Sequence, residues 1–449
     1  MRDLLLVAFF ILTIYFTFKR PFIGVCSWVW IAMMAPTSWA FGFSTQLRLN
    51  LTIVIITFLA FVFAEKNKQF RIGTLGRLIL LFCIWTLISS ITHITFNSDE
   101  VWRRFSDFLK VVALFYFATL LLKRKVHLDT FIWSLVLSVS AYAAMEAFKF
   151  ILSGGGHEVT GRAGVIADRN DFAVALNMCI PLMVYLISVT KHKYLRYGLI
   201  VLILLNVVSI IGTYSRGGFI GLSILAIAFW WRSRYKLPLA LLFMLLIPIG
   251  YSLAPAEWKE RQSTVATAAT EDASFIGRLW AWKISTLIAL DNPMTGGGFR
   301  AVIDQLVWNQ YAGQTPDFGP IATPPIPITE PAKAAHNIYF QVLGDHGFVG
   351  LFIFLAILLY AYRQNNVMTK RMRKAEVGWA STLCSSLNLS IIAYCITGAN
   401  VSLAYFDLSF AIFAIVNVLI LNSDNLIKQH QAASQQVPAH DKAQRPARA

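Results

Sequence analysis

The sequence is poor in charged residues, and in acidic residues most of all. Only 14% of its 449 residues are charged, and the 23 acidic residues are outnumbered by 39 basic ones. Soluble proteins are about a quarter charged. Apolar residues make up 57% of the chain, and apolar runs of membrane-spanning length recur along it. This composition excludes an ordinary soluble domain and indicates an all-α polytopic membrane protein.

The net charge of +16 does not indicate nucleic-acid binding. The sequence lacks a basic domain with aromatic platforms, and its Lys and Arg residues gather in short loops between apolar runs. Loops of this kind are typical of the cytoplasmic side of a membrane protein. The basic loops are 65–77, 123–125, 191–196, 232–236 and 363–374. We therefore expect the intervening loops at 153–170, 213–218, 254–336 and 398–401 on the opposite side.

Cysteine is scarce and shows no pairing pattern. The five cysteines lie inside apolar runs and none belongs to a Cys-x-x-Cys motif; they are Cys26, Cys83, Cys179, Cys384 and Cys395. This pattern argues against a disulfide framework or a zinc site. It favours small apolar packing residues instead. The outer loops also lack an Asp-x-Asp pair for Mg²⁺, and we predict neither a metal nor a cofactor.

The apolar runs predict about twelve transmembrane helices. The candidate spans are 4–18, 21–40, 50–64, 78–95, 108–122, 130–152, 171–190, 196–213, 217–231, 237–253, 337–361, 379–397 and 402–421. The first two runs are short, and a hairpin that does not fully cross is an alternative for them. The predicted organisation is a helix bundle at 1–253, a loop domain with short helices at 254–336, membrane helices at 337–422 and a disordered cytoplasmic tail at 423–449.

The loop 254–336 is the longest predicted connection, and connections of this length are usually functional or disordered. Its segment 274–290 has helical periodicity, with Trp280 and Trp282 placed to lie at a bilayer surface. The later segment 315–331 is rich in proline, which predicts an extended strap or lid.

Several polar residues on the predicted outer face need explaining, because charge at a membrane boundary is costly. Arg216 lies between two spans and is followed by Gly217 and Gly218, which leave room for a ligand. A guanidinium there can hold a phosphate through two hydrogen bonds, or it can anchor a tight turn by snorkelling. Arg278 and Arg300, taken alone, fit surface residues better than ligands.

Polar residues at predicted helix starts have two interpretations each. Arg162 and Asn170 precede a span, where Asn170 or Asp171 can simply be an N-cap. His336 and Asn337 precede another span, and His336 can be a cap or an interfacial residue. The positive end of a helix dipole also disfavours imidazolium, and a neutral imidazole is what a general base requires. Asp407, near the last span, can form an ion pair or orient the histidine.

In this order and spacing, four motifs resemble the O-antigen ligase and polymerase superfamily of bacterial envelope glycosyltransferases. They are ADRNDFA at 167–173, YSRGGF at 214–219, GRLWAW followed by DNPMTGGGF at 277–299, and HNIYFQVLGDHGFVG at 336–350. The resemblance covers residues 160–360 and departs from the family pattern at Arg169, where proline is common. It implies a GT-C-like fold in the bacterial inner membrane, with the site facing the periplasm and the C-terminus in the cytoplasm.

For the activity, the resemblance implies transfer of a glycan from undecaprenyl pyrophosphate to a lipid A-core sugar, with inversion and without a metal. The family's essential residues map onto Arg216 and Arg278, expected to hold the pyrophosphate, and onto His336, expected to be the general base. Supporting roles are possible for Arg162, Asn170, Arg300, Asn337 and Asp407. An O-antigen polymerase and a protein O-oligosaccharyltransferase remain open alternatives. A transporter or flippase is the alternative of a different class.

Overall fold

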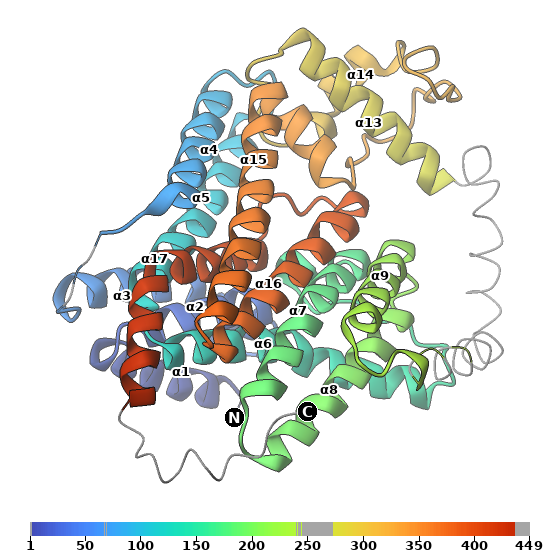
Figure 1. Ribbon diagram of the computed structural model, residues 1–449. Helices are drawn as coiled ribbons and strands as arrows, with labels where there is room; N and C mark the ends of the chain where they lie inside the picture. Colours follow the sequence, from blue (N-terminus) through green and yellow to red (C-terminus); the bar gives the residue numbers. More distant parts are fainter. Residues whose placement is uncertain are drawn as a thin grey trace.

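The computed structural model describes residues 2–66, 68, 70–238, 240, 244 and 273–435, and every regular element in these ranges is helical (Figure 1). Seven of the described helices are long and apolar enough to cross a membrane. These are α4 (Gly73–Ile91), α6 (Lys125–Leu152), α7 (Arg169–Val189), α8 (Lys193–Gly212), α15 (Ile338–Lys374), α16 (Gly378–Thr397) and α17 (Asp407–Gln435). The chain is a multi-pass membrane protein, as predicted. The expected number of about twelve spans is not confirmed, and the predicted span 237–253 lies almost wholly outside the described residues.

The remaining helices are shorter or more charged. They are α1 (Arg2–Lys19), α2 (Phe22–Met34), α3 (Leu49–Phe63), α5 (Ser98–Leu121), α9 (Arg216–Arg232), α13 (Ala273–Asp291) and α14 (Gln305–Ala312). The predicted span 21–40 ends early, because Ala35 adopts a left-handed conformation and Pro36 follows it. The chain then returns to the start of α1, where Asp3 accepts hydrogen bonds from the backbone and hydroxyl of Ser44.

Helix α5 begins ten residues before the predicted span 108–122. Charged residues in its first turns make the sequence resemble a loop, but they pair with one another. Asn97 caps the helix by accepting from the backbone N–H of Glu100, and Glu100 accepts from Arg104 Nε at 2.8 Å. These local pairs explain why two arginines are tolerated at this end of the bundle.

The last helix corrects another predicted boundary. A disordered tail was expected from residue 423, but α17 continues through that position to Gln435. Its polar continuation packs against the extended end of α15, where Arg371 donates to Asp424 at 2.5 Å and to Ser423 at 2.9 Å. The basic segment expected as a loop at 363–374 is itself the end of α15. Helices therefore continue past the apolar runs because polar side chains pair along them.

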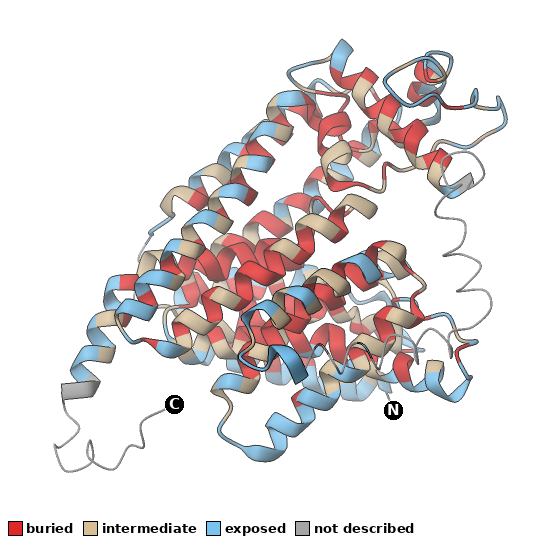
Figure 2. Cartoon of the chain, turned by 45° about the vertical axis from the view of Figure 1, so that its right-hand side comes forward, coloured by how far each residue is buried: buried red, intermediate tan, exposed pale blue. Residues whose placement is uncertain are grey.

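Burial separates central from peripheral helices (Figure 2). Within the apolar window of α7, 78% of residues are buried, against 28% in α8. Large apolar side chains are exposed on α1, α4 and α8, including Leu5, Ile84 and Leu204. An exposed apolar surface of this kind suits contact with lipid hydrocarbon.

Contacts between connecting segments occur at two ends of the bundle. At the basic end, Lys123 pairs with Glu65 at 2.8 Å, and Asn417 donates to the carbonyl of Ile72. At the other end, the backbone of Val159 bonds to Gly212, and that of Ile94 bonds to Gly297. The described part of the loop domain, with α13 and α14, covers this second end (Figure 1, top).

The glycine turn at 296–298 docks the loop domain onto α15. The backbone of this turn makes the docking contacts. Helix α15 breaks at Gly347, which has φ of 67°, and the break frees the carbonyls of Gly344 and Asp345. The N–H groups of Gly297 and Gly298 donate to these carbonyls at 2.9 and 2.8 Å. The glycine turn and the break in α15 thus satisfy each other's backbone hydrogen-bonding groups.

Candidate active site

One face of α13 positions the candidate site. Arg278 and Trp282 are four residues apart, so they project from the same side of the helix. The indole Nε1 of Trp282 donates to the carbonyl of Ala335 at 2.6 Å, and its ring stacks on Phe340 with centroids 5.1 Å apart. Trp280 is also buried and donates to the carbonyl of Pro324. The Trp280 indole thus binds the proline-rich segment, and the Trp282 indole joins α13 to the start of α15. The expected place of both tryptophans at a bilayer surface stays a prediction.

These contacts fix His336, which directly follows Ala335. Its backbone is left-handed, with φ of 43°, and its N–H donates to Ser402 Oγ at 3.0 Å. Histidine is one of the residues that tolerates this conformation. Burial lowers the pKa of His336, and the positive charge of Arg278 lowers it further, while Asp168 opposes the shift. The imidazole is consequently favoured in its neutral form at neutral pH.

Asn337 has a structural role at the same helix start. Its side chain accepts hydrogen bonds from the backbone N–H groups of Tyr339 and Phe340, at 2.9 and 3.3 Å. It is therefore the N-cap of α15. His336 therefore does not cap α15, which was one of the two roles that the sequence allowed for it.

Asn400 connects the two arginines predicted from the sequence. Arg278 donates to Asn400 Oδ1 at 3.4 Å. The Asn400 side chain also packs so closely on Gly217 that a Cβ atom there would lie 2.7 Å from Asn400 Cβ. Arg216 immediately precedes Gly217 and is the first residue of α9. Glycine is required at 217 for this approach, and the result brings both arginines to the same part of the molecule.

The start of α9 is held in a defined geometry around Arg216. Ser215 caps the helix by accepting from the N–H of Gly218 at 3.1 Å, and Asn177 of α7 donates to the Gly218 carbonyl at 3.0 Å. Tyr214 has φ of 51° and donates from its hydroxyl to the Gly155 carbonyl. The guanidinium of Arg216 therefore stands on a rigid helix start rather than on a loose loop.

The polar motif before α7 differs from the prediction in its cap. The N-cap is Asp168, which accepts from the N–H of Asn170 at 2.7 Å, and the helix begins at Arg169. The expectation that Asn170 or Asp171 caps this helix is wrong by two or three residues, because Asp168 already offers the carboxylate that the first turn needs. Asp168 also acts electrostatically on His336, a link that the sequence did not indicate.

Two other predicted residues make contacts elsewhere. Arg162 donates to the carbonyl of Ser38 at 3.1 Å and lies over the Trp39 ring at 4.7 Å, so it holds the short helical turn Pro36–Trp39 that follows α2. Arg300 has φ of 64°, and its N–H donates to Asp345 Oδ1 at 2.9 Å. Its side chain pairs with Glu100 at 3.4 Å. Burial lowers the pKa of Arg300, and the nearby charge of Arg104 adds to this effect.

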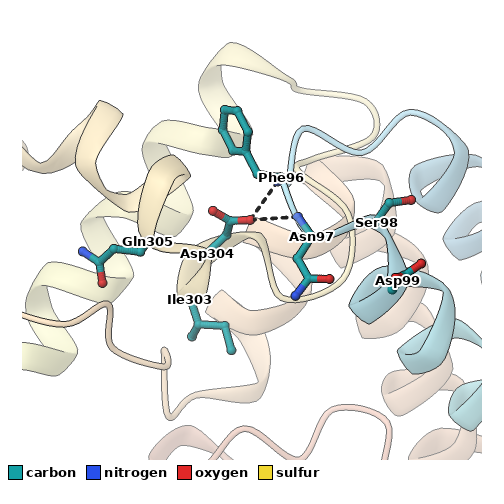
Figure 3. Close-up of a pocket in the computed structure, with 7 residues that line it drawn as sticks. All are labelled: Phe96, Asn97, Ser98, Asp99, Ile303, Asp304 and Gln305. Atoms are coloured by element: carbon teal, nitrogen blue, oxygen red, sulfur yellow. Dashed lines mark hydrogen bonds between the residues drawn. The ribbon is translucent and has the colours of Figure 1, made fainter.

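Arg300 and Asp407 line a cavity of about 300 Å³ that we call the polar cavity. It lies between α5, the turn at 299–300, α15 and the segment 402–407, and Ser402 is part of its wall. A larger hollow of about 650 Å³ lies at the edge of the loop domain, where Asp304 binds the N–H groups of Phe96 and Asn97 (Figure 3). That hollow contains none of the residues predicted from the motifs, so its size does not make it the candidate site.

The fold and the geometry define a multi-pass membrane protein with a half-buried histidine near Arg278 at one end of its helix bundle. Comparison with known families gives the class. Residues 198–355 match the family model described as O-Antigen ligase, and residues 1–191 match a family of unknown function (DUF5935). The match over residues 198–355 supports the O-antigen ligase superfamily, as the motifs predicted, and suggests a membrane glycosyltransferase-like ligase or polymerase. No curated protein matches the chain.

Proposed function

We propose that the chain is an O-antigen ligase that transfers a glycan from undecaprenyl pyrophosphate to a lipid A-core sugar. The observation that carries the proposal is the placement of His336 beside Arg278 through one face of α13. The family match over residues 198–355 includes both residues and Arg216. The charge pattern of the loops supports a periplasmic location for this site, in the inner membrane.

Arg216 and Arg278 hold the pyrophosphate of the donor. Guanidinium groups bind phosphate oxygens through paired hydrogen bonds, and their charge is independent of pH. Both arginines lie on helices. Asn400 accepts a hydrogen bond from Arg278 and packs on Gly217, the residue after Arg216. Preorganised positive charge at a dry boundary stabilises the charge that develops on the leaving oxygen. The arginines thereby meet a need that a divalent cation meets in other transferases.

His336 is the general base. Its imidazole accepts the proton of the acceptor hydroxyl as that oxygen attacks the anomeric carbon of the donor sugar. The new carbon–oxygen bond forms while the bond from that carbon to the phosphate oxygen breaks, and undecaprenyl pyrophosphate leaves with the electron pair. A single displacement inverts the anomeric centre. The lowered pKa keeps the imidazole neutral and able to accept this proton.

Two relatives of this reaction differ only in the acceptor. An O-antigen polymerase uses a second undecaprenyl-linked chain, and a protein O-oligosaccharyltransferase uses a hydroxyl of a protein side chain. The same arginines and histidine serve all three. The transporter alternative is less well supported, because the paired cations and the neutral imidazole suit group transfer better than ion coupling.

Reconstitution of the purified full chain tests the proposal. The chain is supplied with undecaprenyl-pyrophosphate-linked glycan and, in separate reactions, with lipid A-core, undecaprenyl-linked glycan or an acceptor protein. We expect joined product with lipid A-core and none from His336→Ala. Product only with one of the other acceptors would assign the chain to that relative, and uptake by vesicles without any acceptor would revive the transporter alternative.

A further inference from the structure

We infer that the polar cavity is the subsite that binds the acceptor sugar, an inference that rests on the proposed function. Its charged lining comes from four parts of the chain, and comprises Arg104, Asp107, Lys110, Arg300, Asp345 and Asp407. The volume of about 300 Å³ is at the lower end of the range for small-molecule sites. Such a volume suits a single sugar ring better than a polymer.

The cavity adjoins the proposed base. Ser402 is in its wall and accepts the backbone N–H of His336 at 3.0 Å. Gln341 is also in the wall, and its Oε1 accepts the N–H of Ala404 at 3.1 Å, which fixes the segment behind Ser402. A sugar held in this cavity would therefore lie next to the segment that binds the His336 backbone.

The segment 400–407 separates the cavity from the proposed phosphate site. Asn400, at one end, contacts Arg278 and Gly217, whereas Ser402, Tyr405 and Asp407 line the cavity. Inverting displacement requires the acceptor oxygen to approach from the side opposite the leaving diphosphate. Asn400 with its arginine contact and the cavity residues occupy different parts of this segment, which leaves separate places for the diphosphate and the acceptor.

The charges of the cavity favour a neutral, hydroxyl-rich ligand. Its three cations are matched by three carboxylates, and Arg104 and Arg300 both pair with Glu100. Lys110 pairs with Asp107 at 2.8 Å. An anion such as phosphate would find little net positive charge here. Sugar hydroxyls, which donate and accept hydrogen bonds, suit alternating charges of both signs.

Two wall residues offer acceptor oxygens. The side chain of Asn50 lines the cavity, and its Oδ1 atom is buried without a hydrogen-bond partner in the described part of the chain. Buried side-chain oxygens are usually paired. The Asp407 carboxylate is 9% exposed at the start of α17 and offers a second acceptor to the same space.

The test compares the full-length wild type with Asn50→Ala and Asp407→Asn, with Asp99→Asn as the matched control. Asp99 is an exposed carboxylate on the same end of α5 and lies outside the cavity. We expect the KM for lipid A-core to rise roughly tenfold in Asp407→Asn and less in Asn50→Ala, with the KM for the donor unchanged. The control should retain both KM values, and all variants should keep the wild-type Tm in detergent.

Two results would overturn the inference while leaving the proposed function intact. One is an unchanged acceptor KM in both cavity variants. The other is a raised donor KM instead, which would assign the cavity to the donor glycan. If the wild type forms no joined product, the proposed function fails. The cavity is then tested by measuring the binding of core oligosaccharide freed of lipid A. Weaker binding by Asp407→Asn than by the wild type would support the subsite, and equal or absent binding would contradict it.

Discussion

The guanidinium of Arg278 lowers the pKa of His336, although the two residues are 58 positions apart in the chain. The link between them is Trp282, which shares a helix face with Arg278 and binds the carbonyl that precedes His336. A cation and a neutral imidazole are thus held together by packing of the loop domain on α15. This relationship gives the predictions below their direction.

Replacing His336 with alanine should reduce transfer by roughly 10²–10⁴-fold, because the acceptor hydroxyl loses its base. Purified protein and product formation with lipid A-core provide the measurement. His192→Ala is the matched control, since His192 precedes α8 at the basic end of the bundle. Transfer at the wild-type rate by His336→Ala would remove the histidine from the mechanism.

The pH dependence of transfer should change when the charges that act on His336 are removed. Its pKa is lowered, so the neutral base persists at neutral pH and activity falls only as the pH drops through that lowered value. Removing the charge of Arg278 with Arg278→Gln should raise this pKa and move the acid limb of kcat/KM to higher pH. Asp168→Asn should move it to lower pH, because Asp168 raises the pKa. Shifts in the same direction, or none, would contradict the electrostatic link.

Replacing Arg216 with lysine should reduce kcat/KM severely, by about 10-fold or more, because a point charge lacks the paired donors that fit a phosphate. The residue begins α9 on a rigid cap, so lysine cannot recover the geometry by moving the helix. Arg196→Lys on α8 is the control for the same substitution at the basic end of the bundle. Wild-type kinetics in Arg216→Lys would indicate that this arginine is a snorkelling anchor.

Gly296→Ala should destabilise the docking of the loop domain. Gly296 has φ of 63°, and a Cβ there would lie 2.4 Å from the backbone nitrogen of Gly347. The conformation alone costs about 1–2 kcal/mol for a residue with a side chain, and the contact with backbone adds to it. Thermal unfolding in detergent should show a lower Tm. Gly313→Ala is the control, because no atom lies within 4 Å of its Cβ position and it should leave the Tm unchanged.

The sequence predicts the helical membrane fold well, because apolar runs report burial in lipid directly. It predicts helix ends poorly. Arg103 and Arg104 make the start of α5 resemble a loop. Their pairing with Glu100 cannot be predicted from hydropathy, because it depends on the positions of the side chains in space. The polar end of α17 was mistaken for a tail for the same reason, since Arg371 pairs with it from α15.

The candidate site was predicted only as a set of residue types. Charge beside apolar runs is costly and drew attention to Arg216 and His336. The choice of Arg216, Arg278 and His336 as a set came from the resemblance to the O-antigen ligase superfamily. The roles of Trp282 and Asn400 could not be predicted, since each depends on a contact between segments far apart in the chain: Trp282 with Ala335, and Asn400 with Arg278. The one local signal for Asn400 is Gly217, whose missing side chain leaves room for it.

The most direct test of the account is an experimental map of the full chain with undecaprenyl pyrophosphate bound. We predict that the diphosphate lies between the guanidinium groups of Arg216 and Arg278, with the imidazole of His336 turned toward the free space beside Ser402. A diphosphate bound away from both arginines, or an imidazole separated from them by other side chains, would contradict the account.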